Sequence, residues 1–235
     1  MKFFQEEIAK FFQKLQSQEP FVFSKYADGE WLAMQKIDCL PGNGEWAINS
    51  VTEQSSQLLI DSFQYRHPGY YVGISCPCCQ GLGHYYMKQF SGQDDEHLTF
   101  ANLFVNANYQ YFLDHFIPEF ARRPVVLVAN RNSNIAELPF VVEEFWGVGY
   151  NAWVDDLYLI DQIADKNYQD RLVLFSCGPF GNILAHQLWQ RNQHNTYIDV
   201  GSTIDRWLNN DVKNKRLYAL GVPAFSQQVC VWGTE

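Results

Sequence analysis

The chain has 235 residues, a formal net charge of −9 and a pI near 5.1, which argues against a surface that binds nucleic acid or anionic membranes. With 47% hydrophobic residues, this length predicts one domain that spans residues 1–235. No apolar run approaches the roughly 20 residues that cross a bilayer, and the first residues are acidic. We therefore expect no membrane span and a cytoplasmic protein whose six cysteines are reduced.

Helix and strand patterns alternate along the chain. Apolar residues between Phe3 and Leu15 recur at helical spacing and predict an amphipathic helix. Apolar runs predict strands at 22–23, 70–74, 124–129, 171–176 and 196–200, and the segments between them predict helices at 50–65, 79–91, 106–121, 134–147 and 181–192. Short apolar strands separated by helices indicate an α/β fold, with a doubly wound, mostly parallel, Rossmann-like sheet and helices on both faces. In such folds, ligands bind outside the carboxyl ends of the strands.

The first predicted strand ends in a pair of carboxylates, Asp28 and Glu30, separated by Gly29. Both side chains offer the hard oxygen ligands that Mg²⁺ and Mn²⁺ prefer, and glycine lets the backbone turn between them. The alternative is an ordinary junction between a strand and a helix, with Asp28 as the N-cap.

Two later strands also end in loops with polar or glycine residues. The turn at Gly178 and Pro179 precedes a helix and is a candidate phosphate cradle, and Asp199 ends the following strand, where dinucleotide-binding folds place a ribose-binding acid. The alternative is a tight turn that needs glycine for packing. Arg131 follows strand 124–129 and is a candidate pyrophosphate ligand, or else a solvated loop residue beside a helix capped by Ser133 or Asn134.

Cys76, Cys78, Cys79 and His84 follow strand 70–74 and carry atoms that bind zinc. No second paired set of cysteines occurs, and Cys39, Cys177 and Cys230 are scattered. We therefore expect reduced thiols in a turn between a strand and a helix rather than a zinc site.

Three segments together resemble one enzyme family. Residues 23–30 resemble the Arg-aromatic-Gly-Asp-Gly-Glu signature of the GT-D-type glycosyltransferases, with Lys25 in place of arginine and Ala27 in place of glycine. Residues 98–102 resemble the family's Thr-Phe segment, and residues 176–202 resemble its Gly-Pro loop, helix and Ile-Asp-(Ile/Val)-Gly strand.

This resemblance implies a single GT-D-like domain that transfers a sugar from a nucleotide-sugar donor, a UDP-sugar above all, to a glycan or lipid-linked glycan acceptor. It implies a Mn²⁺ or Mg²⁺ ion on Asp28 and Glu30, which would be the catalytic pair. The donor-binding residues expected with this pair are Lys25, Gly29, Asn102, Arg131, Gly178, Pro179, Asp199 and Ser202. The residues leave the general base open among Glu45, His84, Asp199 and Asp205.

Two other functions are compatible with the same residues. One is a Rossmann-like NAD(P)-binding oxidoreductase built on the segment from Gly178 to Asp199. The other is a nucleotide- or sugar-binding module without catalysis, in which the carboxylate pair only caps a helix.

Overall fold

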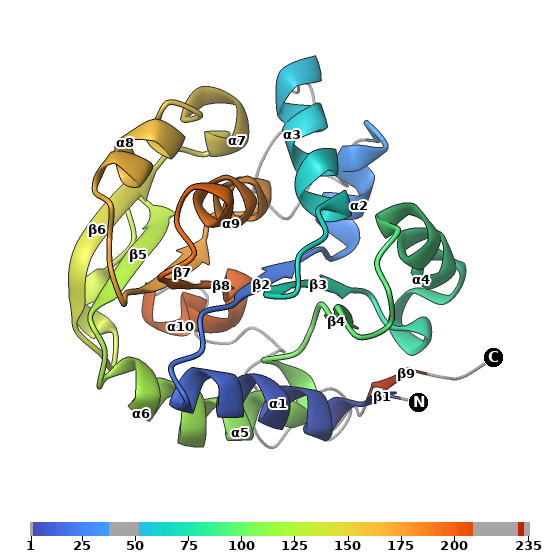
Figure 1. The fold of residues 1–235 in the computed structure, drawn as a ribbon, viewed down its shortest axis with the longest axis horizontal. Helices are drawn as coiled ribbons and strands as arrows, with labels where there is room; N and C mark the ends of the chain where they lie inside the picture. Colours follow the sequence, from blue (N-terminus) through green and yellow to red (C-terminus); the bar gives the residue numbers. More distant parts are fainter. Residues whose placement is uncertain (1, 38–51, 209–229, 233–235) are drawn as a thin grey trace.

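A sheet of seven parallel strands forms the centre of the protein in the computed structural model, which describes residues 2–37, 52–208 and 230–232 (Figure 1). In chain order the strands are β2 (Val22–Lys25), β3 (Tyr70–Ile74), β4 (Leu98–Phe100), β5 (Val125–Asn130), β6 (Val142–Val148), β7 (Leu172–Ser176) and β8 (Thr196–Asp199). Their order across the sheet is β4-β3-β2-β8-β7-β5-β6. The predicted α/β fold with a parallel sheet is therefore confirmed.

The strand order reverses between β2 and β8. From β2 the chain moves outward through β3 to β4, and it then crosses to the other half of the sheet and returns through β7 to β8. Strand β2 pairs in parallel with both neighbours, so that Val22 lies beside Tyr70 on one side and Tyr197 on the other. The carboxyl ends of β2 and β8 thus meet at the topological switch point, where ligands of such sheets bind.

Helices cover both faces of the sheet. In chain order they are α1 (Phe4–Gln16), α2 (Asp28–Met34), α3 (Glu53–Gln64), α4 (Pro77–Ser91), α5 (Tyr109–Tyr111), α6 (Ile117–Phe120), α7 (Ala152–Asp155), α8 (Leu159–Asp165), α9 (Pro179–Arg191) and α10 (Asp205–Leu208). A π-helical turn at Phe112–Phe116 joins α5 to α6, and 3₁₀ turns occupy Asn106–Asn108, Ile135–Glu137 and Gly201–Ile204. None of these helices is both long and apolar enough to cross a membrane.

Alternate strand residues pack on opposite faces, because successive side chains of a strand point to opposite sides. Val22 belongs to the core cluster that also contains residues of α3, α8 and α9, the helices above the sheet in Figure 1. Phe23 belongs to the second cluster, with Ile8, Phe11 and Leu15 of α1 and the aromatic residues between α5 and α6. Two apolar cores therefore enclose one sheet.

The segment predicted as a helix at 134–147 is instead a 3₁₀ turn followed by the edge strand β6. Val142, Phe145 and Trp146 fit helical spacing, and Val142 and Trp146 also fit the alternation of a strand. Periodicity alone therefore does not decide between helix and strand. Parallel pairing with β5, at Leu127 beside Phe145 for example, decides it. The short strand β4 and the helices α7 and α8 were also absent from the prediction.

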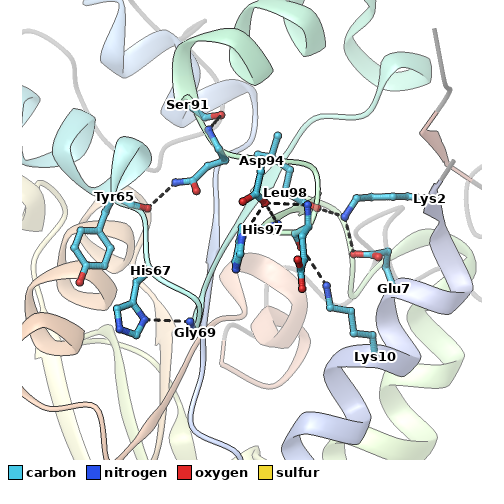
Figure 2. Close-up of polar contacts among 12 residues, drawn as sticks. Lys2, Glu7, Lys10, Tyr65, His67, Gly69, Ser91, Asp94, His97 and Leu98 are labelled. Carbon is cyan, nitrogen blue, oxygen red and sulfur yellow. Dashed lines mark hydrogen bonds and ion pairs between the residues drawn. The ribbon is translucent and has the colours of Figure 1, made fainter.

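Polar contacts hold the loops at the amino ends of β3 and β4, away from the switch point (Figure 2). Asp94 Oδ1 accepts hydrogen bonds from the backbone N–H of His97 at 3.0 Å and from its Nδ1 at 2.8 Å, which closes the turn before β4. Lys2 donates to the carbonyl of Leu98, and Lys10 donates to the carbonyl of Glu96 at 3.3 Å. The bonds from Lys2 and Lys10 attach the N-terminal segment, up to helix α1, to the amino edge of the sheet.

Replacing Phe23 by alanine tests how far the fold depends on the central strand. Phe23 is fully buried, and its ring lies 5.4 Å from that of Phe11 and 5.0 Å from that of Phe104. We expect Phe23→Ala to lower the free energy of unfolding by about 3–5 kcal/mol, measured by urea denaturation. Tyr85→Ala, at an exposed ring, is the control and should change stability little. Equal effects of the two substitutions would contradict the assignment of Phe23 to the core.

Candidate functional site

The carboxylate pair begins helix α2 directly after β2. Asp28 is the first helical residue and is exposed, and Ala27 occupies the N-cap position. Glu30 is only 8% exposed, and its Oε2 accepts a hydrogen bond from the backbone N–H of Ala27 at 2.8 Å. The alternative that Asp28 caps the helix is therefore wrong, because the side chain of Glu30 makes the capping hydrogen bond. That bond uses only Oε2 of Glu30 and leaves Oε1 out.

Asp199 is buried at the end of β8, beside the end of β2. Its Oδ1 accepts from the backbone N–H of Gly201 at 2.9 Å, and its Oδ2 accepts from the backbone N–H of Lys25 at 3.3 Å. Burial raises the pKa of Asp199 to about 7; the Lys25 ammonium opposes this rise, the Glu30 carboxylate adds to it, and the two backbone N–H groups oppose it. Glu30, Lys25 and Asp199 thus interact electrostatically at one place.

Gly201 leaves room for the side chain of Lys25. A Cβ at Gly201 would lie 2.5 Å from Lys25 Cε and 2.8 Å from Nζ, and the φ of Gly201 is +49°. Both the contact and the left-handed backbone favour glycine here. Ser202 follows in the same 3₁₀ turn, so the expected donor residues Lys25, Asp199 and Ser202 come together at the switch point.

Asn182 joins β2 to helix α9 and was not among the predicted site residues. Its Nδ2 donates to Lys25 O at 2.8 Å and to Ser24 Oγ at 3.0 Å, and it lies 3.5 Å from Asp199 Oδ2. The side chain is fully buried. The sequence did carry a signal for it, since an amide in an otherwise apolar first turn of a helix needs buried partners.

The glycine-rich turn before α9 lies next to this group. Gly178 is the N-cap of α9 with φ +57°, Pro179 is its first residue, and Asn182 in the same turn contacts β2. The turn follows β7, which pairs with β8. Gly178 and Pro179 are therefore at the carboxyl edge of the sheet that also carries Gly29, Asp28 and Asp199.

Arg131 and Asn102 lie farther along that edge. Arg131 follows β5, which β7 and β8 separate from β2, and its Nη2 lies 3.7 Å from Asp156 Oδ2. Asn134, one of the two expected caps, accepts from the N–H of Ala136 at 3.3 Å. Asn102 follows β4, and its Nδ2 donates to the Sγ of Cys230 at 2.8 Å.

The four candidate general bases are in different places. Asp199 belongs to the group at the switch point, and Asp205 begins α10. His84 is buried in α4, with Nδ1 2.8 Å from the carbonyl of Ser75, and burial lowers its pKa. Glu45 lies outside the described residues.

Asp28 and Glu30 could hold a metal only together with a bound ligand, and not as a closed protein cage. Among the residues that the structure describes, no third carboxylate, histidine or cysteine completes a cluster with this pair. Mg²⁺ is commonly held by one or two carboxylates together with substrate phosphates and water. The carboxylate of Asp28, which is exposed, and the Oε1 atom of Glu30, which the bond to Ala27 does not use, would be the protein ligands of such an ion.

Comparison with known proteins connects the chain to one fold. No family model matches the sequence, and a search of curated proteins finds no similar sequence. Among solved structures, the chain is similar to "A New Glycosyltransferase (DUF1792) from Streptococcus sanguinis", with 14% identity, a TM-score of 0.60 and coverage of 83% of this chain and 80% of that one. A second structure, described as a domain of unknown function 1792 with "a distinct glycosyltransferase fold", has 14% identity, a TM-score of 0.59 and coverage of 83% and 77%. The chain therefore has the fold of these proteins.

The raised pKa of Asp199 predicts how stability changes with pH. The folded pKa of about 7 exceeds 3.8, the ordinary pKa of an aspartate in an unfolded chain. The unfolded state therefore loses its proton first, and ionisation of Asp199 costs stability as pH rises between these two values. We expect the stability of Asp199→Asn relative to the wild type to increase from about pH 4 to about pH 7 and then to level off. Urea denaturation across this range measures it, with Asp161→Asn on the surface as the control. If the difference in stability between Asp199→Asn and the wild type does not change with pH, the prediction that burial raises the pKa of Asp199 is wrong.

Proposed function

We propose that this protein is a glycosyltransferase that uses a nucleotide-sugar donor, a UDP-sugar above all, together with Mn²⁺ or Mg²⁺. The observation that carries the proposal is the position of the Asp28 and Glu30 pair directly after β2, at the switch point of a sheet with a glycosyltransferase fold, where Asp199 Oδ2 accepts from the backbone N–H of Lys25 at 3.3 Å. The resemblance of residues 23–30 to the GT-D signature supports it from the sequence.

Asp28 and Glu30 would hold the metal, Asp28 through its exposed carboxylate and Glu30 through Oε1. A bound divalent ion supplies charge neutralisation for the departing diphosphate. Without such an ion, two carboxylates beside a diphosphate would repel it.

The protein's own residues bind and orient the donor. Lys25 supplies a positive charge beside the phosphates, and the Gly178-Pro179 turn and Ser202 line the same edge. Asp199 is a positioning residue, because both of its oxygens accept backbone N–H groups that hold Lys25 and Gly201 in place. Arg131 would reach the donor from β5, and Asn102 from β4.

The acceptor in this proposal is a glycan or a lipid-linked glycan, and the protein acts in the cytoplasm on a soluble pool of donor. An acidic protein with a net charge of −9 suits a neutral sugar acceptor better than a nucleic acid.

The geometry favours this function over an oxidoreductase. A dinucleotide-binding acid must be available to a ribose hydroxyl, whereas Asp199 is 4% exposed and both of its oxygens are engaged by the protein. A binding module without catalysis differs from a transferase only in turnover, which an assay with donor and acceptor measures.

The metal requirement gives the first test. We expect UDP to bind appreciably only when Mn²⁺ or Mg²⁺ is present, as measured by calorimetry, and Asp28→Asn to remove this binding and to lower turnover of UDP-sugars by about 100-fold or more. Asp165→Asn, on the exposed face of α8, is the matched control and should leave both unchanged. Full activity in EDTA would overturn the metal proposal, and tight binding of a nicotinamide dinucleotide without metal would favour the oxidoreductase.

Two substitutions at Glu30 separate its capping role from its metal role. Glutamine can still accept the hydrogen bond from Ala27 N–H, so Glu30→Gln should keep the wild-type stability to within about 0.5 kcal/mol while weakening metal-dependent UDP binding. Glu30→Ala should lose both that binding and about 1 kcal/mol of stability. Urea denaturation and calorimetry on the same samples give the two readouts. Unchanged UDP binding in Glu30→Gln would leave Glu30 with the capping role alone.

A further inference from the structure

Four cysteines from distant parts of the chain come together at the carboxyl ends of β3 and β4. Cys76, Cys78 and Cys79 lie at the start of α4, and Cys230 directly precedes the C-terminal strand β9 (Val231–Trp232). Their four Sγ atoms all lie within 4.8 Å of one another. The distance is 3.0 Å between Cys76 and Cys78, and 3.9 Å between Cys79 and Cys230. All four are free thiols rather than disulfides.

We propose that these four cysteines bind a structural zinc ion. In a tetrahedral site with Zn–S bonds of about 2.3 Å, neighbouring sulfur atoms are about 3.8 Å apart, and the observed distances bracket this value. Four sulfur ligands in a tetrahedral arrangement select zinc or iron, whereas the harder Mg²⁺ and Mn²⁺ prefer oxygen. The site is therefore chemically distinct from the Asp28 and Glu30 pair.

The residues around the cluster support four sulfur ligands rather than three and a histidine. Asn102 Nδ2 donates to Cys230 Sγ at 2.8 Å, the kind of hydrogen bond that orients a metal-bound thiolate. His84 does not join the cluster: its Nδ1 lies 2.8 Å from the Ser75 carbonyl, and its ring packs edge-on against Trp232 at 4.5 Å. Cys76 and Cys230 are buried and Cys78 and Cys79 are exposed, which leaves a route for the ion to enter.

The ion would attach the end of the chain to the sheet. Strand β9 pairs antiparallel with β1 (Lys2–Phe3), and Trp232 packs against Phe100 of β4 with ring centroids 5.4 Å apart. A bond from zinc to Cys230 would join this terminal pair to the start of α4. Because ligands 151 residues apart in sequence meet only in the folded chain, zinc binding and folding would be coupled.

Metal analysis of the protein purified without added metal tests the proposal. We expect a stoichiometric amount of zinc by plasma mass spectrometry, retained during dialysis against a mild chelator. Cys230→Ser should lose this zinc, and Cys177→Ala, which alters a cysteine outside the cluster, should keep it. If Cys230→Ser does not fold, Cys78→Ser decides the question, because Cys78 is exposed and its substitution should release zinc to the chelator without unfolding the protein.

Several results would overturn the zinc site. The first is stoichiometric zinc that remains after chelator treatment in Cys230→Ser or in Cys78→Ser. The second is iron in place of zinc. The third is a metal-free protein whose mass before reduction is two hydrogens below that of the reduced chain, which indicates a disulfide. Cobalt added to the zinc-free protein should produce the strong visible absorption of a tetrahedral thiolate site, and its absence would also count against the proposal. Asp28→Asn should retain its zinc, so failure of the donor site and failure of the zinc site are distinguishable.

Discussion

The burial of Asp199 where the strand order reverses is the constraint on which the candidate site depends. A buried carboxylate is costly unless hydrogen bonds replace its water. Here the backbone N–H groups of Lys25 and Gly201 offset part of that cost, and burial still raises the pKa of Asp199. Asn182 adds a third contact and also binds the backbone of β2. These bonds fix the ends of β2 and β8 and the start of α9 relative to one another. The first turn of α2, which carries Asp28 and Glu30, therefore begins from a fixed end of β2.

The same edge of the sheet carries two groups of possible metal ligands with different chemistry. Carboxylate oxygens follow β2, and thiol sulfurs follow β3, the adjacent strand. Hard ions prefer the first group and soft ions the second, so the two would select different metals without competing. Asn102 is associated with both groups. It follows β4, where the family resemblance implies a contact with the donor, and its side-chain amide donates to the Sγ of Cys230.

The sequence predicted those features that depend on local pattern. Five strands and the helices α1, α3, α4 and α9 follow from apolar periodicity, because burial of one face imposes a spacing on neighbouring residues. The same reasoning was wrong for β6, where Val142, Phe145 and Trp146 have helical spacing but pairing with β5 selects the strand. The alternative that Asp28 is the N-cap was also wrong, because Ala27 takes the N-cap position and Glu30 accepts its backbone N–H.

By itself, the sequence determined the class of fold, the position of the carboxylate pair at a strand end, and the glycine-rich turn after another strand. Only the tertiary structure decided which strand ends are adjacent. That adjacency brought Asp199 to Lys25 across 174 residues. The pairing of β9 with β1 accompanies the second long-range contact, between Cys230 and Cys79 across 151 residues. A spacing rule describes residues that share one helix or strand, whereas these contacts depend on which distant strands pair, which no local pattern encodes.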